Sequence, residues 1–158
     1  MDQLLEKYCT CGIKPPKNSA VASPHTNSLA FATVPEISRD DLQLPNGQVS
    51  LRYGRHFGNH SGFGILHIWE QHQAALTSAG YPTIHDVARY VSEIVRPRAD
   101  ITCEFSDMRG DHKIAVVRSN AGTAILKPIR SDQESTLYSI VTAFDRRTRE
   151  GTLVGRLT

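Results

Sequence analysis

The hydrophobic period of this chain changes once, at Pro97, and that change constrains the fold more than any other feature. Before Pro97, two segments carry apolar residues at helical spacing, and after it apolar and polar residues alternate as they do in β-strands. Helices followed by strands favour an α+β fold in which the helices lie on one face of an antiparallel sheet. We therefore expect two helices packed on one face of a four- to five-stranded antiparallel meander.

Residues 61–78 form the first expected helix. One continuous stripe of this helix carries Ile65, Ile68, Trp69, His72 and Leu76. His67 lies off the stripe, so the helix can pack with one side and present an imidazole with another. Ser61 is a candidate N-cap residue, and Gly80 and Pro82 end the helix.

Thr83 caps the second expected helix, which stops before Pro97. Beyond it, the expected strands are residues 100–105, 113–118, 123–127 and 135–144. The tight connection at Ser119–Gly122 is typical of a hairpin. Short turns between successive strands predict a meander, to which the tail after residue 145 adds at most one strand.

Residues 1–48 are rich in turn-forming residues and are interpreted as an N-terminal arm or linker. The working domain would then span residues 49–158. Within it, residues 54–64 hold four glycines, which predicts a loop that bends tightly or approaches a ligand closely. Arg55, His56 and His60 lie in this loop.

Composition narrows the class of protein. The chain has 158 residues, of which 39% are hydrophobic, as expected for one soluble globular domain. No apolar run approaches the roughly 20 residues of a membrane helix, so we expect no membrane partner. Residues 50–158 carry 14 basic and 11 acidic side chains, and 12 of the basic ones are arginine. Arginine suits phosphate recognition, although a coding bias toward arginine would give the same excess.

The motifs of several enzyme classes are missing from the sequence. It has no clustered carboxylates for magnesium, no phosphate-loop lysine, no dinucleotide glycine fingerprint and no nucleophile elbow. Histidines, cations and hydroxyls remain, and these suit cleavage of RNA without a metal or other cofactor. The ribose 2′-hydroxyl is the nucleophile in that reaction, so the protein supplies an acid or base and cations.

Two runs, at residues 62–72 and 138–144, carry a family resemblance. The first is Gly-Phe-Gly-Ile-Leu-His-Ile-Trp-Glu-Gln-His and the second is Tyr-Ser-Ile-Val-Thr-Ala-Phe. Together they resemble the barnase/EndoU/colicin/RelE-like nuclease superfamily, in the branch found in phage proteins and polymorphic toxin C-termini. The resemblance covers roughly residues 50–145. It implies a histidine-bearing helix ahead of a four-stranded antiparallel sheet.

The resemblance also implies roles for particular residues. His67 would be the general acid or base, Thr142 would bond the scissile phosphate, and Arg118 or Lys127 would bind it as a cation. One of the loop histidines, His56 or His60, would be the second acid–base partner. The candidates for holding the RNA backbone are Arg55, Lys113, Arg146 and Arg147. Solvated surface positions and ordinary strand propensity would account for the same residue types.

The function implied is that of a ribonuclease toxin or effector, with tRNA among its targets, whose product carries a 2′,3′-cyclic phosphate. An acidic immunity protein would cover the basic cleft in the producing cell. Such a protein acts in the cytoplasm of a target or host cell after delivery within a secreted toxin or a phage protein.

Two alternatives from other classes stay open. An ADP-ribosyltransferase toxin also uses a small sheet, and it would need a catalytic glutamate, for which Glu104 and Glu134 are the candidates. A non-catalytic RNA-binding or phage structural module would bind RNA in a salt-dependent way without cutting it.

Overall fold

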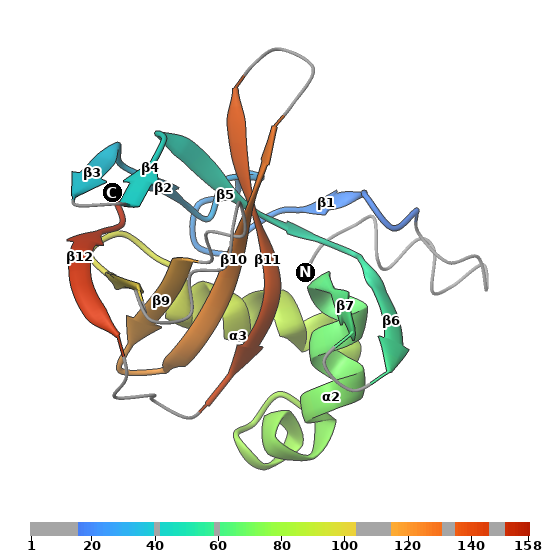
Figure 1. Cartoon of the computed structure of the whole chain (residues 1–158). Helices are drawn as coiled ribbons and strands as arrows, with labels where there is room; N and C mark the ends of the chain where they lie inside the picture. The colour runs from blue at the N-terminus through green and yellow to red at the C-terminus, as the bar shows by residue number, and fades with distance from the viewer. Residues whose placement is uncertain (1–15, 40–41, 59–60, 104–114, 131–134, 146–150) are drawn as a thin grey trace.

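The computed structural model describes residues 16–39, 42–58, 61–103, 115–130, 135–145 and 151–158. These residues fold as α+β, with two α-helices and a mixed, mostly antiparallel sheet of eight strands (Figure 1). The expected α+β class is therefore confirmed, but the expected count of four to five strands is wrong. Strands from the N-terminal third and from the C-terminal tail extend the sheet on both sides.

The centre of the sheet is the expected meander. Its strands are β8 (Asp100–Cys103), β9 (Ala115–Ser119), β10 (Gly122–Arg130) and β11 (Thr136–Phe144). Each pairs with the next in antiparallel orientation. The tail supplies β12 (Thr152–Arg156), which pairs with β8 and so extends that edge of the sheet.

The other side of the sheet is built from residues that precede the helices. These strands are β1 (Ala20–Val21), β2 (Ala32–Val34) and β5 (Gly47–Arg52). β5 runs parallel to β11, which the meander did not predict, while β1 and β2 pair with β5 in antiparallel orientation. A separate two-stranded sheet consists of β3 (Ile37–Arg39) and β4 (Leu42–Leu44).

These early strands contribute to the hydrophobic core, whereas an arm or linker was expected for this part of the chain. Val21, Phe31, Val34, Leu42 and Leu44 are all almost fully buried in the same cluster as the helices. Strands of two or three residues are too short to show a period in the sequence, and only β2 falls in a segment, residues 29–34, that the sequence indicated as a short strand or an apolar strap. Residues 1–15 lie outside the described part, and the division of the chain at residue 48 stays a prediction.

The helices are α2 (Gly64–Ser78) and α3 (Val87–Ile94), and a single 3₁₀ turn, η1 (Ile84–Asp86), leads into α3. The predicted cap at Thr83 is confirmed, because the carboxylate of Asp86 accepts hydrogen bonds from the backbone and side chain of Thr83 at 3.0 and 2.9 Å. The predicted cap at Ser61 is wrong. Phe63 is the N-cap residue, without a side-chain cap bond, and Ser61 belongs to a strand.

That strand is part of a short hairpin, β6 (Arg55–Gly58) and β7 (Ser61–Phe63), which replaces the expected glycine loop. The hairpin packs beside α2, at the end of β11 that is not paired with β5 (Figure 1).

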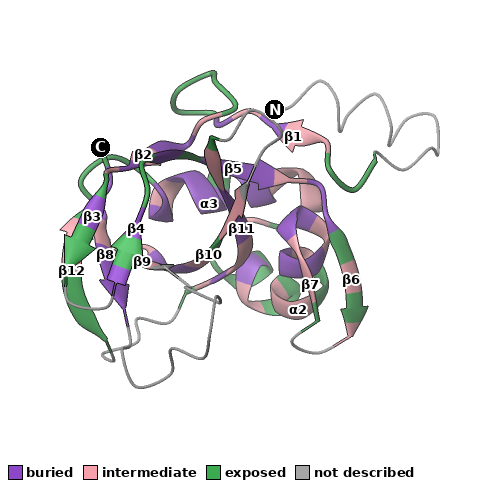
Figure 2. Cartoon of the chain, turned by 45° about the horizontal axis from the view of Figure 1, so that its top comes forward, coloured by how far each residue is buried: buried purple, intermediate pink, exposed green. Residues whose placement is uncertain are grey.

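The helix α3 covers one face of the sheet. Its buried residues belong to the same hydrophobic core as the buried residues of the strands on that face (Figure 2). The strand residues of this apolar face include Ile101, Val117, Ala124, Leu126 and Ile140. The opposite face carries most of the hydroxyl-bearing and charged residues of these strands.

Candidate active site

Two histidines meet between the β6–β7 hairpin and the start of α2. The Nδ1 atoms of His56 and His67 lie 3.0 Å apart, and the ring centroids are 5.2 Å apart. His67 is 3% exposed, whereas His56 is only partly buried. The sequence predicted His67 to work with His56 or His60. The structure brings His56 to His67, and His60 lies outside the described residues.

Gly62 makes room for this histidine pair. It lies opposite His56 in the hairpin and has a φ of +139°, which side chains rarely adopt. A Cβ atom at this position would also lie 2.7 Å from Nδ1 of His67. The glycine is therefore needed both for its backbone conformation and for the space it leaves.

A hydrogen bond between the two Nδ1 atoms requires complementary tautomers. In the neutral pair one ring donates at Nδ1 and keeps a lone pair on Nε2, while the other accepts at Nδ1 and carries its hydrogen on Nε2. With His56 as the donor, its partly exposed ring presents a lone pair on Nε2.

Arg52 is a fixed cation next to the hairpin. Its Nε donates to Oγ of Ser139 at 2.9 Å, its Nη1 donates to Oδ1 of Asn18 at 2.8 Å, and its guanidinium lies 4.1 Å from the ring centroid of Phe63. Burial lowers the pKa of Arg52, but from so high a value that the group stays charged at neutral pH. The sequence did not single out Arg52, whose only signal is its place in a strand just before the glycine-rich segment.

The sheet face opposite α3, here called the polar face, carries hydroxyls and cations together with the apolar side chains of Val116, Ile125 and Phe144. Residues paired across a sheet share a face, and the register places on this face Ser50, Asp100, Thr102, Arg118, Thr123, Lys127, Ser139 and Thr142. Lys127 is directly opposite Ser139, which accepts the hydrogen bond from Arg52. Lys127 is exposed. Lys127 and Arg52 therefore both lie next to Ser139, one by strand pairing and the other by a hydrogen bond.

A β-bulge brings Thr142 onto the polar face. Ile140 pairs with Leu126 and Thr142 with Ile125, so Val141 is the extra residue. Without the bulge, Thr142 and Ser139 would point to opposite faces, because side chains alternate along a strand. Oγ1 of Thr142 is buried and has no hydrogen-bond partner in the described structure.

The helix α2 runs alongside β11. Phe63, its N-cap residue, contacts Arg52, and Arg52 bonds Ser139 of β11. Farther along, the rings of His72 and Phe144 lie with centroids 6.0 Å apart.

Arg118 lies on the same face but away from the histidine pair. It is opposite Thr123 of β10 and Asp100 of β8, so β10 separates it from β11. Strands lie about 4.8 Å apart, which puts the backbone of Arg118 roughly 10 Å from that of β11. Of the two cations predicted from the sequence, the structure thus favours Lys127 over Arg118 as the one nearer to the histidine pair.

The remaining sequence candidates contribute less. Arg55 is exposed on β6, opposite Phe63. Lys113, Arg146 and Arg147 lie outside the described residues. Among the side chains that are described, no three His, Cys, Asp or Glu groups converge as a metal site would require.

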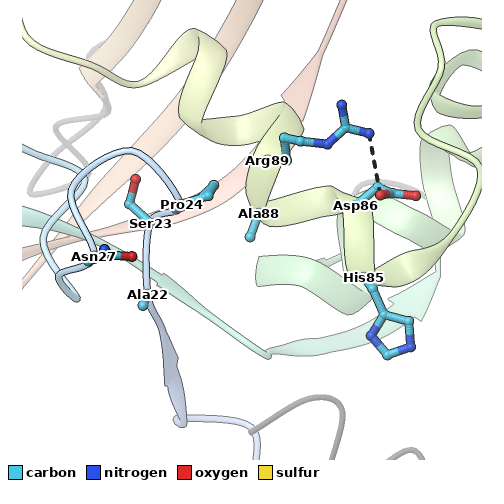
Figure 3. Close-up of a pocket in the computed structure, with 8 residues that line it drawn as sticks. All are labelled: Ala22, Ser23, Pro24, Asn27, His85, Asp86, Ala88 and Arg89. Atoms are coloured by element: carbon cyan, nitrogen blue, oxygen red, sulfur yellow. Dashed lines mark hydrogen bonds and ion pairs between the residues drawn. The ribbon is translucent and has the colours of Figure 1, made fainter. Parts of the chain in front are cut away.

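A separate small pocket of about 220 Å³ lies between the loop after β1 and the start of α3 (Figure 3). Its lining includes Ser23, Asn27, His85 and Arg89, and none of the residues of the histidine pair. Arg89 is engaged with Asp86 at 3.4 Å, as the dashed line shows. This pocket is therefore not part of the candidate active site.

Comparison of the chain with protein families, with curated proteins and with solved structures finds no match. Within the described residues, none of the helices is both long and apolar enough to cross a membrane. What the site can do therefore has to be argued from its geometry.

Proposed function

We propose that this protein is a metal-independent endoribonuclease that cuts RNA by attack of the ribose 2′-hydroxyl. The observation that carries the proposal is the hydrogen-bonded pair of His56 and His67 beside the fixed guanidinium of Arg52. A base that titrates near neutral pH and a preorganised cation are what this reaction requires of a protein.

His56 is the base in this proposal, and His67 is its positioning residue. Nε2 of His56 takes the proton from the 2′-hydroxyl, while Nδ1–H of the same ring donates to Nδ1 of His67. The bond from O2′ to phosphorus forms as the bond from phosphorus to O5′ breaks. The products are a 2′,3′-cyclic phosphate and a 5′-hydroxyl. This revises the expectation that His67 itself is the acid or base, because His67 is the buried member of the pair.

The polar face supplies the remaining groups. Arg52 is already held by Ser139 and Phe63, so it stabilises the charged phosphorane without reorganising. Lys127, exposed and opposite Ser139, binds the phosphate and gives its proton to the departing O5′. The unpartnered hydroxyl of Thr142 donates a hydrogen bond to a phosphate oxygen.

The biological setting follows from the family resemblance and from charge. We infer a toxin or effector with the barnase/EndoU/colicin/RelE-like fold, acting on cytoplasmic RNA such as tRNA. An acidic immunity protein is the partner that would cover a face bearing Arg52, Lys127 and Arg118. The rival transferase would use Glu104 or Glu134, which lie outside the described residues, so no contact in the structure favours it.

The test is incubation of purified protein with total cellular RNA in EDTA, beside His56→Ala and the matched control His25→Ala. The side chain of His25 is exposed, and its Nε2 lies 2.9 Å from Oε1 of Glu93. We expect discrete fragments with cyclic-phosphate ends from the wild-type protein and from the control, but not from His56→Ala. Intact RNA with the wild-type protein would instead favour the binding module, and cutting by all three proteins would overturn the role of the pair.

A further inference from the structure

A second cationic site lies at the far end of the polar face. Here the turn after α3 and the β9–β10 turn enclose an open cleft of about 650 Å³, a size typical of ligand pockets. Its arginines are Arg96, Arg98 and Arg118, and Asp100 is its one acidic residue. Asn120 adds a neutral donor. We call this the arginine cleft.

The arginines of the cleft are poorly neutralised by the protein. Oδ1 of Asp100 already accepts a hydrogen bond from Nε of Arg156 at 3.1 Å, and Arg156 adds a fourth cation beside the cleft. Arg96 approaches Glu93 only at 3.8 Å. The Nε atom of Arg118 is buried without a hydrogen-bond partner in the described structure. Buried donors normally have partners, so the cleft is suited to an anion whose oxygens would satisfy them.

Arg98 occupies a backbone position that costs stability. The backbone N–H of Ala99 donates to the carbonyl of Arg96 at 3.1 Å, which closes a turn with Pro97 and Arg98 at its centre. The φ of Arg98 is +77°, as at the third position of a type II turn, where glycine is preferred. An arginine in this left-handed region is unfavourable, and such strain concentrates at functional sites.

The cleft is connected to the histidine pair by the polar face. Arg118 is opposite Thr123, and Thr123 is opposite Phe144 at the end of β11. Ser139, next to Arg52, lies five residues earlier on the same strand. Strand spacing and rise place the cleft about 20 Å from Ser139, which is several nucleotides along an extended strand.

We propose that Arg96, Arg98 and Arg118 form a second phosphate-binding subsite, which holds the backbone of the RNA strand at a distance from the cleaved bond. The inference rests on the proposed ribonuclease function for the identity of the strand. The charge and geometry of the cleft do not depend on it.

The test uses Arg98→Gly, which removes one cation and at the same time relieves the turn. The matched control is Arg89→Gln, which removes a cation from α3 outside the cleft. Binding of a short single-stranded DNA, which has no 2′-hydroxyl and is not cut, is measured by fluorescence anisotropy over a range of salt. Thermal unfolding is followed for each variant.

We expect Arg98→Gly to be at least as stable as the wild-type protein, yet to bind several-fold more weakly. Its plot of log affinity against log salt should be shallower by about 0.7, the value for one lost phosphate contact on a single strand. Arg89→Gln should leave the slope unchanged. Equal affinity and slope for Arg98→Gly and the wild-type protein would overturn the subsite.

A cleavage assay separates this inference from the proposed function. With RNA substrates, Arg98→Gly should raise the KM for a long strand while leaving cleavage of a dinucleotide unchanged. If no protein cuts RNA but Arg98→Gly still weakens DNA binding, the ribonuclease proposal fails and the phosphate-binding cleft stands. If RNA is cut and both variants bind alike, the cleft fails and the ribonuclease stands.

Discussion

Nδ1 of His56 and Nδ1 of His67 lie 3.0 Å apart, and only one of the two rings is buried. In the proposed reaction the two rings have different roles, because the partly exposed ring can meet a substrate while the buried ring orients it. Enzymes in which a buried carboxylate orients a catalytic histidine through Nδ1 use a similar arrangement. In this protein the buried partner is an imidazole.

The activity that is lost when His67 is replaced by alanine should be partly kept by a conservative substitution. In His67→Ala, His56 loses its acceptor, and we expect kcat to fall by about 100-fold. His67→Asn keeps a carbonyl oxygen near the position of Nδ1 and should restore a large part of the rate. Equal loss of rate in His67→Ala and His67→Asn would mean that His67 has only a structural role.

Thr142→Val should separate activity from stability. The hydroxyl of Thr142 is buried and unpartnered in the described structure, so its removal should leave the free energy of unfolding unchanged or raise it by up to about 1 kcal/mol. Cleavage should nevertheless fall at least about tenfold, because the phosphate loses a donor. The control is Thr102→Val, which removes a hydroxyl bonded to the carbonyl of Val116 and should cost stability. Full activity in Thr142→Val would remove this residue from the site.

Two glycines of the β6–β7 hairpin provide matched substitutions that test how tightly the histidine rings are packed. Gly62→Ala places a methyl group against the backbone carbonyl oxygen of Arg55 and 2.7 Å from Nδ1 of His67, whereas Gly58→Ala meets open space. Both have positive φ, at +139° and +153°, so the backbone penalty is similar. We expect Gly62→Ala to lower the melting temperature and the cleavage rate well below those of Gly58→Ala. Comparable values for the two variants would show that the rings are not tightly packed against this strand.

His72 should make the protein less stable in mild acid. Burial lowers the pKa of His72, and the nearby charge of Asp145 opposes this only in part. The unfolded state, with a pKa near 6.5, then binds more protons than the folded state, so the free energy of unfolding falls as pH drops below that value. Chemical denaturation from pH 8 to pH 5 should give a shallower decline for His72→Gln. An identical pH dependence in both proteins would contradict the assigned burial.

The change of period at Pro97 was enough to predict the fold class, both helices and the four meander strands. The capping box of Thr83 and Asp86 was also readable, because it needs residues only three apart. The strands β1, β3 and β4 were not, since two or three residues show no alternation. Their place is decided by contacts such as the burial of Phe31 and Leu42 in the shared core.

The candidate site was predictable only in part for the same reason. His67 and His56 are eleven residues apart, and the glycines between them indicated a tight approach. Arg52 gains its role from Ser139, 87 residues away, through a parallel strand pairing that the local pattern does not encode. The bulge at Val141 turns Thr142 to the polar face, and a strict alternation of side chains would have placed it on the other.

The central claim is that the 2′-hydroxyl of RNA is the nucleophile and that His56 activates it. The most direct measurement is cleavage, in EDTA, of an RNA oligonucleotide and of a copy in which the nucleotide before the cut carries a single 2′-deoxy substitution. The account predicts rapid cutting of the RNA, with a 2′,3′-cyclic phosphate end, and no cutting at the substituted position. Cleavage of both oligonucleotides at the same rate would contradict it.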